Sequence, residues 1–258
     1  MVESIDNLIQ LIVFGICFGI SLRLTYTKRS RAMGILSLFY ISFFLGDLYW
    51  LLYIVFYDST PKVFYVSEFN WYASYLFLIL LMQQTLEPEA RRQRSRVLLL
   101  PLVFAAGMCV FFMQWGDYIS NIISAVLMGL MMFRAMQGSL YCREKDTAAD
   151  HLTDAEKDPA AGHLTGREKD PAADHLTGRE KDTAAMQNGY SAKSIAAQMR
   201  LCRLILVFCV IEYVMWTVSC FWRGDGLTNP YYWLDGMLTV CSAALLPVLD
   251  KGVDVWTT

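Results

Sequence analysis

Histidine is scarce in this sequence and absent from its long apolar segments. Only three of 258 residues are histidine, and they lie in one polar stretch, at His151, His163 and His175. Serine–histidine or histidine–metal centres therefore cannot form within the apolar segments. The motifs GxSxG, HExxH, GxGxxG and the P-loop are missing as well. Because no catalytic constellation is visible, we expect a chain that is not an enzyme and that uses no cofactor or metal ion.

Paired cysteines and an excess of one charge are also missing. None of the seven cysteines forms a CxxC pair, and most lie inside apolar runs. We therefore expect the cysteines to act as small buried apolar side chains and not to form a disulfide framework or a metal site. A net charge of −2 offers no overall basic surface for nucleic acid, so no nucleic-acid partner is expected.

Apolar residues, in contrast, are abundant. They make up 55% of the chain, whereas soluble domains contain about 45–50%. A helix crosses the hydrocarbon core with roughly 20 apolar residues, and lipid favours helices because they pair their own backbone groups. The sequence predicts an all-α, polytopic membrane bundle of about seven transmembrane helices. The seven apolar runs are 8–24, 33–57, 69–86, 97–113, 119–136, 203–222 and 231–249.

Basic residues indicate the orientation of the predicted helices. Lysine and arginine gather in alternate loops, as expected for the cytoplasmic side of a membrane protein. The predicted topology has the N-terminus outside and the short C-terminal tail in the cytoplasm, in a multi-pass protein of the cell membrane. The residues concerned are Arg23, Lys28, Arg29, Arg31, Arg91, Arg92, Arg94, Arg96, Arg134, Lys193, Arg200 and Arg203.

A twelve-residue repeat separates the fifth and sixth predicted helices. The tripeptide EKD recurs at 144, 156, 168 and 180, and 143–185 holds eleven acidic and seven basic residues. So polar a stretch cannot bury enough apolar area to offset its ordering entropy, and its two prolines interrupt long helices. We predict a disordered or partly helical loop. The expected organisation is helices one to five in 1–142, the cytoplasmic repeat loop in 143–199, and helices six and seven with the tail in 200–258.

Three carboxylates lie within the apolar runs. Asp47 falls in the second, Glu212 near the middle of the sixth, and Asp235 about one turn into the seventh. A charge at the bilayer centre costs about 2.5–3.5 kcal/mol on insertion scales, so such residues usually face the bundle interior or a cavity. They are candidates for ligand binding or ion coupling. The alternative is a protonated or hydrogen-bonded packing role.

Helical spacing places these carboxylates on polar and aromatic seams. Asp47 shares a face with Trp50, Glu212 with Trp216, and Asp235 with Thr239. We predict an outward-opening polar cavity with aromatic walls, suited to a cationic or amphipathic small ligand; Tyr72 and Trp233 are expected at its rim. The predicted site residues are Asp47, Glu212, Asp235, Asn70, Asn121, Trp50 and Trp216.

Three functions remain open. The first is a membrane sensor or receptor-like module that binds a small ligand and signals to a cytoplasmic protein. The second is a small-solute or proton-coupled transporter, favoured by equal spacings of 23 residues from Asp47 to Asn70 and from Glu212 to Asp235. The third is a carboxylate-dependent membrane enzyme. The lipid bilayer is the partner common to all three.

Overall fold

The computed structural model describes residues 2–59, 61, 65–115, 117–157, 174–222, 224 and 226–256. For residues 65, 148–157, 174–193 and 253–256 it describes the backbone alone. These ranges are almost entirely helical and contain no strand, so the all-α prediction is confirmed. The α-helices are α1 (Val2–Lys28), α2 (Arg31–Tyr57), α3 (Tyr65–Thr85), α4 (Leu99–Phe112), α5 (Tyr118–Lys157), α6 (Asp174–Phe221) and α7 (Pro230–Trp256).

Five of these helices are long and apolar enough to cross a membrane. They are α1, α2 and the segments Tyr118–Thr147, Ser194–Phe221 and Pro230–Gly252 of α5, α6 and α7. The 21-residue α3 is not among the five. A 3-10 turn, η2 (Arg96–Leu98), extends α4 into the shorter apolar segment Arg96–Phe112. The lengths and composition of the five helices indicate a membrane protein.

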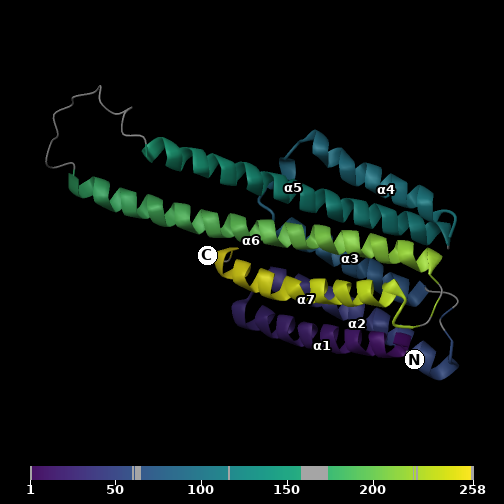
Figure 1. Ribbon diagram of the computed structural model, residues 1–258. Helices are drawn as coiled ribbons and strands as arrows, with labels where there is room; N and C mark the ends of the chain where they lie inside the picture. Colours follow the sequence, from purple (N-terminus) through teal and green to yellow (C-terminus); the bar gives the residue numbers. More distant parts are fainter. Residues whose placement is uncertain are drawn as a thin grey trace.

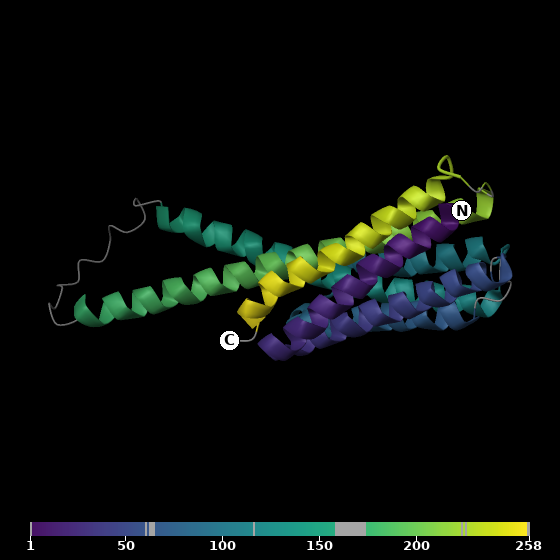
Figure 2. The same cartoon turned by 90° about the horizontal axis from the view of Figure 1, so that it is seen from below.

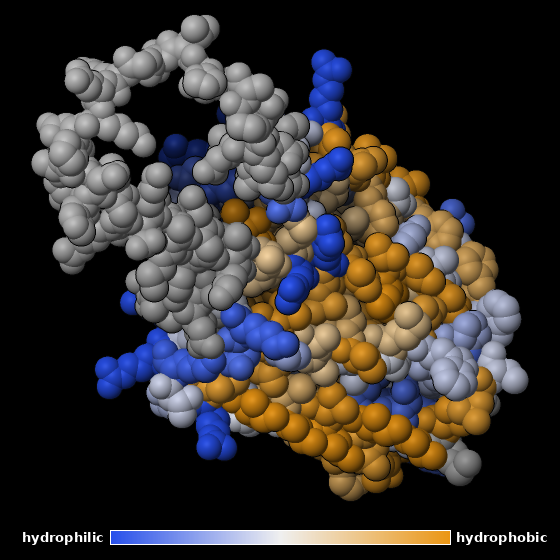
Figure 3. Space-filling view, turned by 60° about the vertical axis from the view of Figure 1, so that its left-hand side comes forward, coloured by the Kyte–Doolittle hydropathy of each residue, from blue (hydrophilic) through white to orange (hydrophobic). Residues whose placement is uncertain are grey.

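Large apolar side chains lie on the outside of the bundle. On α1, Ile9 and Ile16 are 54% and 56% exposed; on α4 and α7, Val110 and Val240 are 71% and 70% exposed. Figure 3 shows such side chains over a broad face, with hydrophilic ones gathered near the end where α5 and α6 leave the bundle. A contiguous apolar exterior of this size suits contact with lipid tails.

The helices run side by side along one axis (Figures 1 and 2). In contact order α1, α2, α3, α5, α6 and α7 form a closed ring, since α7 also packs against α1. Helix α4 lies against α5 outside this ring, and the Phe104 ring of α4 contacts Tyr213 of α6 at 4.8 Å. The two ends of the chain lie at opposite ends of the bundle.

Local capping explains several helix boundaries. The hydroxyl of Ser30 accepts a hydrogen bond from the Met33 amide at the start of α2, as an N-cap serine does. Asp58 ends α2 in the left-handed region, with φ 48°. Asn229 accepts from the Tyr231 amide at 3.0 Å and precedes Pro230, a residue favoured at the first helical position.

Helix extends into the range predicted as a repeat loop. Helix α5 continues to Lys157 and α6 begins at Asp174, whereas the loop was expected over 143–199. Alanine, glutamate, lysine and arginine are good helix formers, which explains the helical backbone outside the bundle. The rest of the predicted loop, 158–173, lies outside the described residues.

Aromatic rings form the centre of the ring of helices. Phe39 and Phe43 of α2 pack edge-to-face against Phe208 of α6, with ring centroids 6.3 and 6.4 Å apart. Tyr75 of α3 meets the same Phe208 ring at 6.2 Å. The buried Tyr40 hydroxyl donates to the Ser242 carbonyl of α7 at 2.9 Å. These contacts join α2, α3, α6 and α7 at mid-depth and close the bundle there.

A glycine permits close approach between helices α5 and α6. A Cβ on Gly138 would lie 2.5 Å from the Cys202 sulfur and 2.5 Å from a Leu86 methyl group. Cys202 is one of five buried cysteines, and all seven are free. These sulfurs therefore serve as compact apolar side chains at helix contacts.

We predict that Gly138→Ala destabilises the fold by about 1–3 kcal/mol, since overpacking forces side chains and backbone apart. Gly107→Ala is the matched control: nothing lies within 4 Å of its Cβ position, and alanine favours a helix by up to about 1 kcal/mol over glycine. Thermal unfolding of the two purified variants in detergent measures the difference. Equal melting temperatures would contradict the tight α5–α6 contact.

Candidate functional site

A cavity of about 500 Å³ opens at the end of the bundle that carries the start of α1. It lies between α1, α2, α3, α6 and α7, above the central aromatic rings. Phe43 and Leu238 form part of its wall, and the α6–α7 connection contributes Asn229. The polar and aromatic side chains that line it include Glu3, Asp6, Gln10, Asp47, Trp50, Trp71, Glu212, Trp216, Ser219, Trp222, Tyr231, Tyr232 and Asp235.

Five carboxyl groups share this cavity, whereas no described lining residue is basic. Such an arrangement is unfavourable when all five are ionised, because like charges at close range repel strongly in a poorly solvated site. Arg223, next to the lining residue Gly224, lies outside the described residues. The carboxyl groups belong to Glu3, Asp6, Asp47, Glu212 and Asp235.

Asp47 is 3% exposed, and its carboxyl group lies next to a tryptophan side chain. The Trp71 side chain of α3 lies beside its carboxyl group, and its approach depends on Gly46. A Cβ at that position would be 2.9 Å from the Trp71 indole nitrogen. One carboxyl oxygen, Oδ2, is buried without a hydrogen-bond partner among the described atoms. The Asp47 carboxyl thus retains an unused acceptor in the cavity.

Glu212 is 4% exposed and fixed by two aromatic donors. The Tyr75 hydroxyl of α3 donates to its Oε1 atom, and the Trp216 indole, one turn along α6, donates to the same oxygen at 3.0 Å. Its other oxygen, Oε2, is buried and lacks a described partner. Buried acceptors without a partner cost about 1–3 kcal/mol each in proteins, so the two free oxygens need a functional explanation.

Asp6 of α1 and Asp235 of α7 form a carboxyl pair. Their side chains are joined by a hydrogen bond. A carboxylate has no proton to donate, so this bond requires one proton on one member of the pair. Nearby, Glu3 accepts from the Trp50 indole at 2.9 Å, which ties the start of α1 to α2. The cavity lining therefore combines a carboxyl–carboxyl pair with two buried acceptors that have no described partner.

The structure brings five of the seven predicted site residues together. Asp47, Trp50, Glu212, Trp216 and Asp235 all line the cavity. The other two predicted residues, Asn70 and Asn121, are not among the lining residues.

Asn70 and Asn121 serve the backbone and are not among the lining residues. Asn70 donates to the Val66 carbonyl at 2.9 Å. Asn121 donates to the carbonyls of Phe112 and Trp115, at 2.8 and 2.7 Å, and so closes the turn between α4 and α5. Helical phasing alone does not distinguish such local bonds from a cavity position.

The expected rim residues also lie elsewhere. Tyr72 bonds to Ser120 of α5, and Trp233 is 66% exposed, with its indole donating to the Leu227 carbonyl. Glu3, Asp6 and Gln10 also line the cavity but were not predicted as site residues, although they follow helical spacing of three and four. Glu3 and Asp6 stand before the first apolar run, and Gln10 is an uncharged residue near its start.

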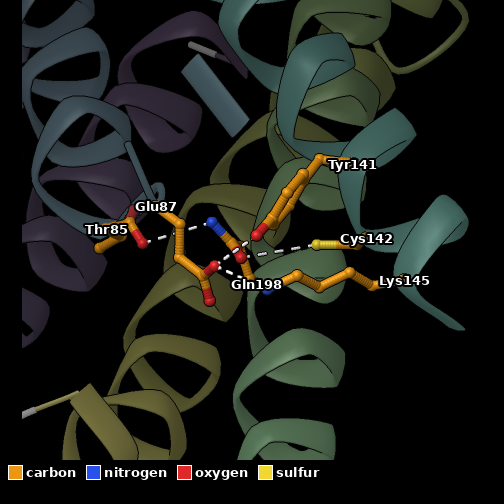
Figure 4. Close-up of polar contacts among 6 residues, drawn as sticks. All are labelled: Thr85, Glu87, Tyr141, Cys142, Lys145 and Gln198. Atoms are coloured by element: carbon orange, nitrogen blue, oxygen red, sulfur yellow. Dashed lines mark hydrogen bonds and ion pairs between the residues drawn. The ribbon is translucent and has the colours of Figure 1, made fainter. Parts of the chain in front are cut away.

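A second polar network joins three helices at the opposite end of the bundle (Figure 4). Glu87, just after α3, accepts from the Tyr141 hydroxyl at 2.5 Å and from the Lys145 ammonium at 3.0 Å, both on α5. Gln198 of α6 lies between them and donates to the Thr85 carbonyl at 3.4 Å. Side chains from α3, α5 and α6 are thus held together near the predicted cytoplasmic surface.

Comparison of the chain with protein-family models, curated proteins and solved structures finds no match. Function is therefore argued from the sites themselves.

The Glu87 network predicts a pH-dependent contribution to stability. Burial raises the pKa of Glu87, but hydrogen bonds from Tyr141 and Lys145 outweigh it, and the pKa lies below its ordinary 4.5. A carboxylate with a lowered folded-state pKa stabilises the fold above its unfolded-state pKa. This contribution disappears as the pH falls through the folded-state value.

We expect Glu87→Gln to lower stability at pH 7 by at most about 1 kcal/mol, as for other partly exposed ion pairs. The difference from the unaltered chain should shrink below about pH 4.5. Melting temperatures in detergent at pH 7 and pH 4 test this. Glu89→Gln is the control, because Glu89 is exposed; an equal loss in both variants would contradict the role of the network.

Proposed function

We propose that this chain is a multi-pass membrane sensor or receptor-like module of the cell membrane. It binds a small organic cation in the outer cavity and passes a helix movement to a cytoplasmic protein. The observation that carries this proposal is the pair of buried, unpartnered oxygens of Asp47 and Glu212 in a tryptophan-lined cavity. A small organic cation supplies the positive charge that these carboxyl groups lack, and a hydroxyl or N–H group on it can donate to the unpartnered oxygens.

The proposed topology has seven spans, with the cavity facing outward. The ends of the chain lie at opposite ends of the bundle, as an odd number of crossings requires. Arginine-rich segments lie at the end away from the cavity, in keeping with a cytoplasmic position. Helices α3 and α4 run beside the five longer ones and supply the remaining two spans.

The chemistry of the wall favours an organic cation. Indole faces attract ammonium groups, by about 0.5–2 kcal/mol per contact depending on desolvation. The volume of about 500 Å³ is within the range of small-molecule sites. Among the described residues, no three carboxylate, histidine or cysteine side chains are grouped closely enough to hold a metal ion. The spread of the carboxyl groups suits a ligand with several atoms.

Helix α6 provides the path for signalling. It carries Glu212 at the cavity and Gln198 in the network around Glu87. The fourteen residues between them correspond to about 21 Å of helix. A ligand that draws the Glu212 carboxylate toward itself would shift α6 against α3 and α5, and the helical backbone transmits such a shift with little loss.

The proposal predicts that choline quenches or shifts the tryptophan fluorescence of the purified chain. Its neutral isostere, 3,3-dimethylbutan-1-ol, should have no effect, because it lacks the charge. Glu212→Gln and Asp47→Asn should each weaken choline binding by about tenfold or more, as expected for a buried charged partner. Glu89→Gln, at the other end of the bundle, should bind like the unaltered chain. Equal binding of choline and its isostere would refute the assignment of ligand class.

A proton-coupled transporter is the second candidate, favoured by the Asp6–Asp235 pair. A cation that enters beside this pair can displace its shared proton, which is how a carboxyl site couples proton and solute. Proteoliposomes loaded with a pH-sensitive dye distinguish the two functions. A transporter moves protons when choline is added outside, and Asp235→Asn abolishes this movement. Choline binding without any solute or proton flux is the result expected of a sensor.

A further inference from the structure

The segment between α3 and α4 is a clamped, arginine-rich loop at the end opposite the cavity. It contains the 3-10 turn η1 (Ala90–Arg92), and Ala90 is fully buried. The Gln137 amide of α5 donates to the carbonyls of Arg91 and Gln93, at 3.2 and 3.3 Å. Arg134 donates to the Gln137 side-chain oxygen at 3.0 Å. The loop backbone is therefore held against α5 in one conformation.

This clamp creates an open hollow of about 760 Å³. Arg91, Arg92 and Arg94 line it together with Ser95 and Gln137, and all three arginines are exposed. Arg91 donates to the Leu86 carbonyl at 3.1 Å. The hollow thus presents several guanidinium groups, amide groups and a hydroxyl on one side of a fixed backbone.

The acidic side chains nearby leave these arginines uncompensated. Glu87 is bound by Tyr141 and Lys145, and Glu144 accepts from the Gln93 amide at 2.7 Å. Within the described part of the chain, no ion pair joins a carboxylate to Arg91, Arg92 or Arg94. The lining of the hollow holds three arginines and no acidic residue, so its charge is positive and suits an anion.

The apolar helix that follows the loop indicates where the hollow lies relative to the membrane. Beginning three residues after Arg96, the exposed side chains are apolar: Leu99 and Leu100 are each 59% exposed, and Leu102 and Val103 are each 66% exposed. These residues suit the hydrocarbon core, so the arginine loop lies at the level of the lipid headgroups. Basic clusters immediately beside a membrane-spanning helix attract anionic lipids.

We propose that this hollow binds the phosphorylated headgroup of an anionic membrane lipid. The planar guanidinium forks of Arg92 and Arg94 suit bidentate hydrogen bonds to phosphate oxygens, and the Ser95 hydroxyl lines the same hollow. A general excess of positive charge on the cytoplasmic side accounts for arginines in this loop. That general excess of charge does not explain why Gln137 holds the loop backbone in place beside the arginines. The proposal is independent of what the outer cavity binds.

The test uses the full chain purified in a zwitterionic detergent and probed by native mass spectrometry or calorimetry. The probes are dioctanoyl phosphatidylinositol bisphosphate, dioctanoyl phosphatidylcholine and free inositol trisphosphate. We expect the bisphosphate lipid to bind more tightly than the other two. The double variant Arg92→Gln/Arg94→Gln should bind it about 30-fold more weakly, from the usual contribution of each basic residue near anionic lipid.

The matched control is Arg143→Gln/Arg200→Gln, which removes the same charge from exposed positions outside the hollow. This control should lose less than about threefold in affinity; equal losses in the two double variants would overturn the site. Gln137→Met keeps every arginine but removes the clamp, and it should weaken binding by about tenfold. An unchanged affinity in this variant, in a chain that still elutes as a folded species, would also overturn it. Tighter binding of free inositol trisphosphate than of the lipid would reject the lipid as the ligand.

Discussion

The burial of carboxyl groups inside a bundle that is apolar on its outside is the constraint on which the rest of the structure depends. Lipid leaves the backbone no external partners, so each apolar segment becomes a helix, and its polar side chains must turn inward. Glu212 meets this demand through Tyr75 and Trp216, which fixes α6 against α3. Asp6 and Asp235 form a hydrogen bond with each other, and this bond holds α1 against α7. These polar contacts thus hold α3 to α6 and α1 to α7 at the cavity end of the bundle.

The same constraint leaves the cavity incompletely satisfied. Well-packed interiors pair nearly all buried polar groups, and the central rings around Phe208 show that this chain can pack closely. Yet Asp47 Oδ2 and Glu212 Oε2 remain without described partners, beside a space of about 500 Å³. Leucine or phenylalanine side chains filling that space would make the fold more stable, because they would bury apolar surface. Retaining open acceptors at a cost in stability is typical of sites that bind ligands.

Much of this arrangement follows from sequence patterns, and the exceptions have physical causes. Each apolar run falls largely within one helix, because hydrocarbon thickness sets a minimum length for a crossing segment. Helix also extends beyond several runs, from Val2 in α1 and to Lys157 in α5, where polar residues continue the helix. Charged residues within those runs identify Asp47, Glu212 and Asp235, because burial there demands compensation. Asn121 illustrates the failure: its amide closes a turn, and phasing carries no information about local backbone bonds. Glu3, Asp6 and Glu87 stand outside the apolar runs, so only the tertiary contacts reveal their partners.

A tight contact between α5 and α6 lies near the arginine-rich loop, where Gly138 leaves no room for a side chain. Glu212 and Cys202 lie on the same helix, and the Cys202 sulfur rests against Gly138, where no side chain separates α5 from α6. The next residue, Gln137, holds the arginine loop by two hydrogen bonds. Because Leu86 occupies the other side of Gly138, α6 cannot move toward α5 without displacing either α3 or the loop. A close-packed contact of this kind passes on a shift of a few tenths of an ångström, which a contact between flexible side chains would absorb. Under the two proposals, occupation of the cavity and of the arginine hollow would act on this α5–α6 contact from opposite ends.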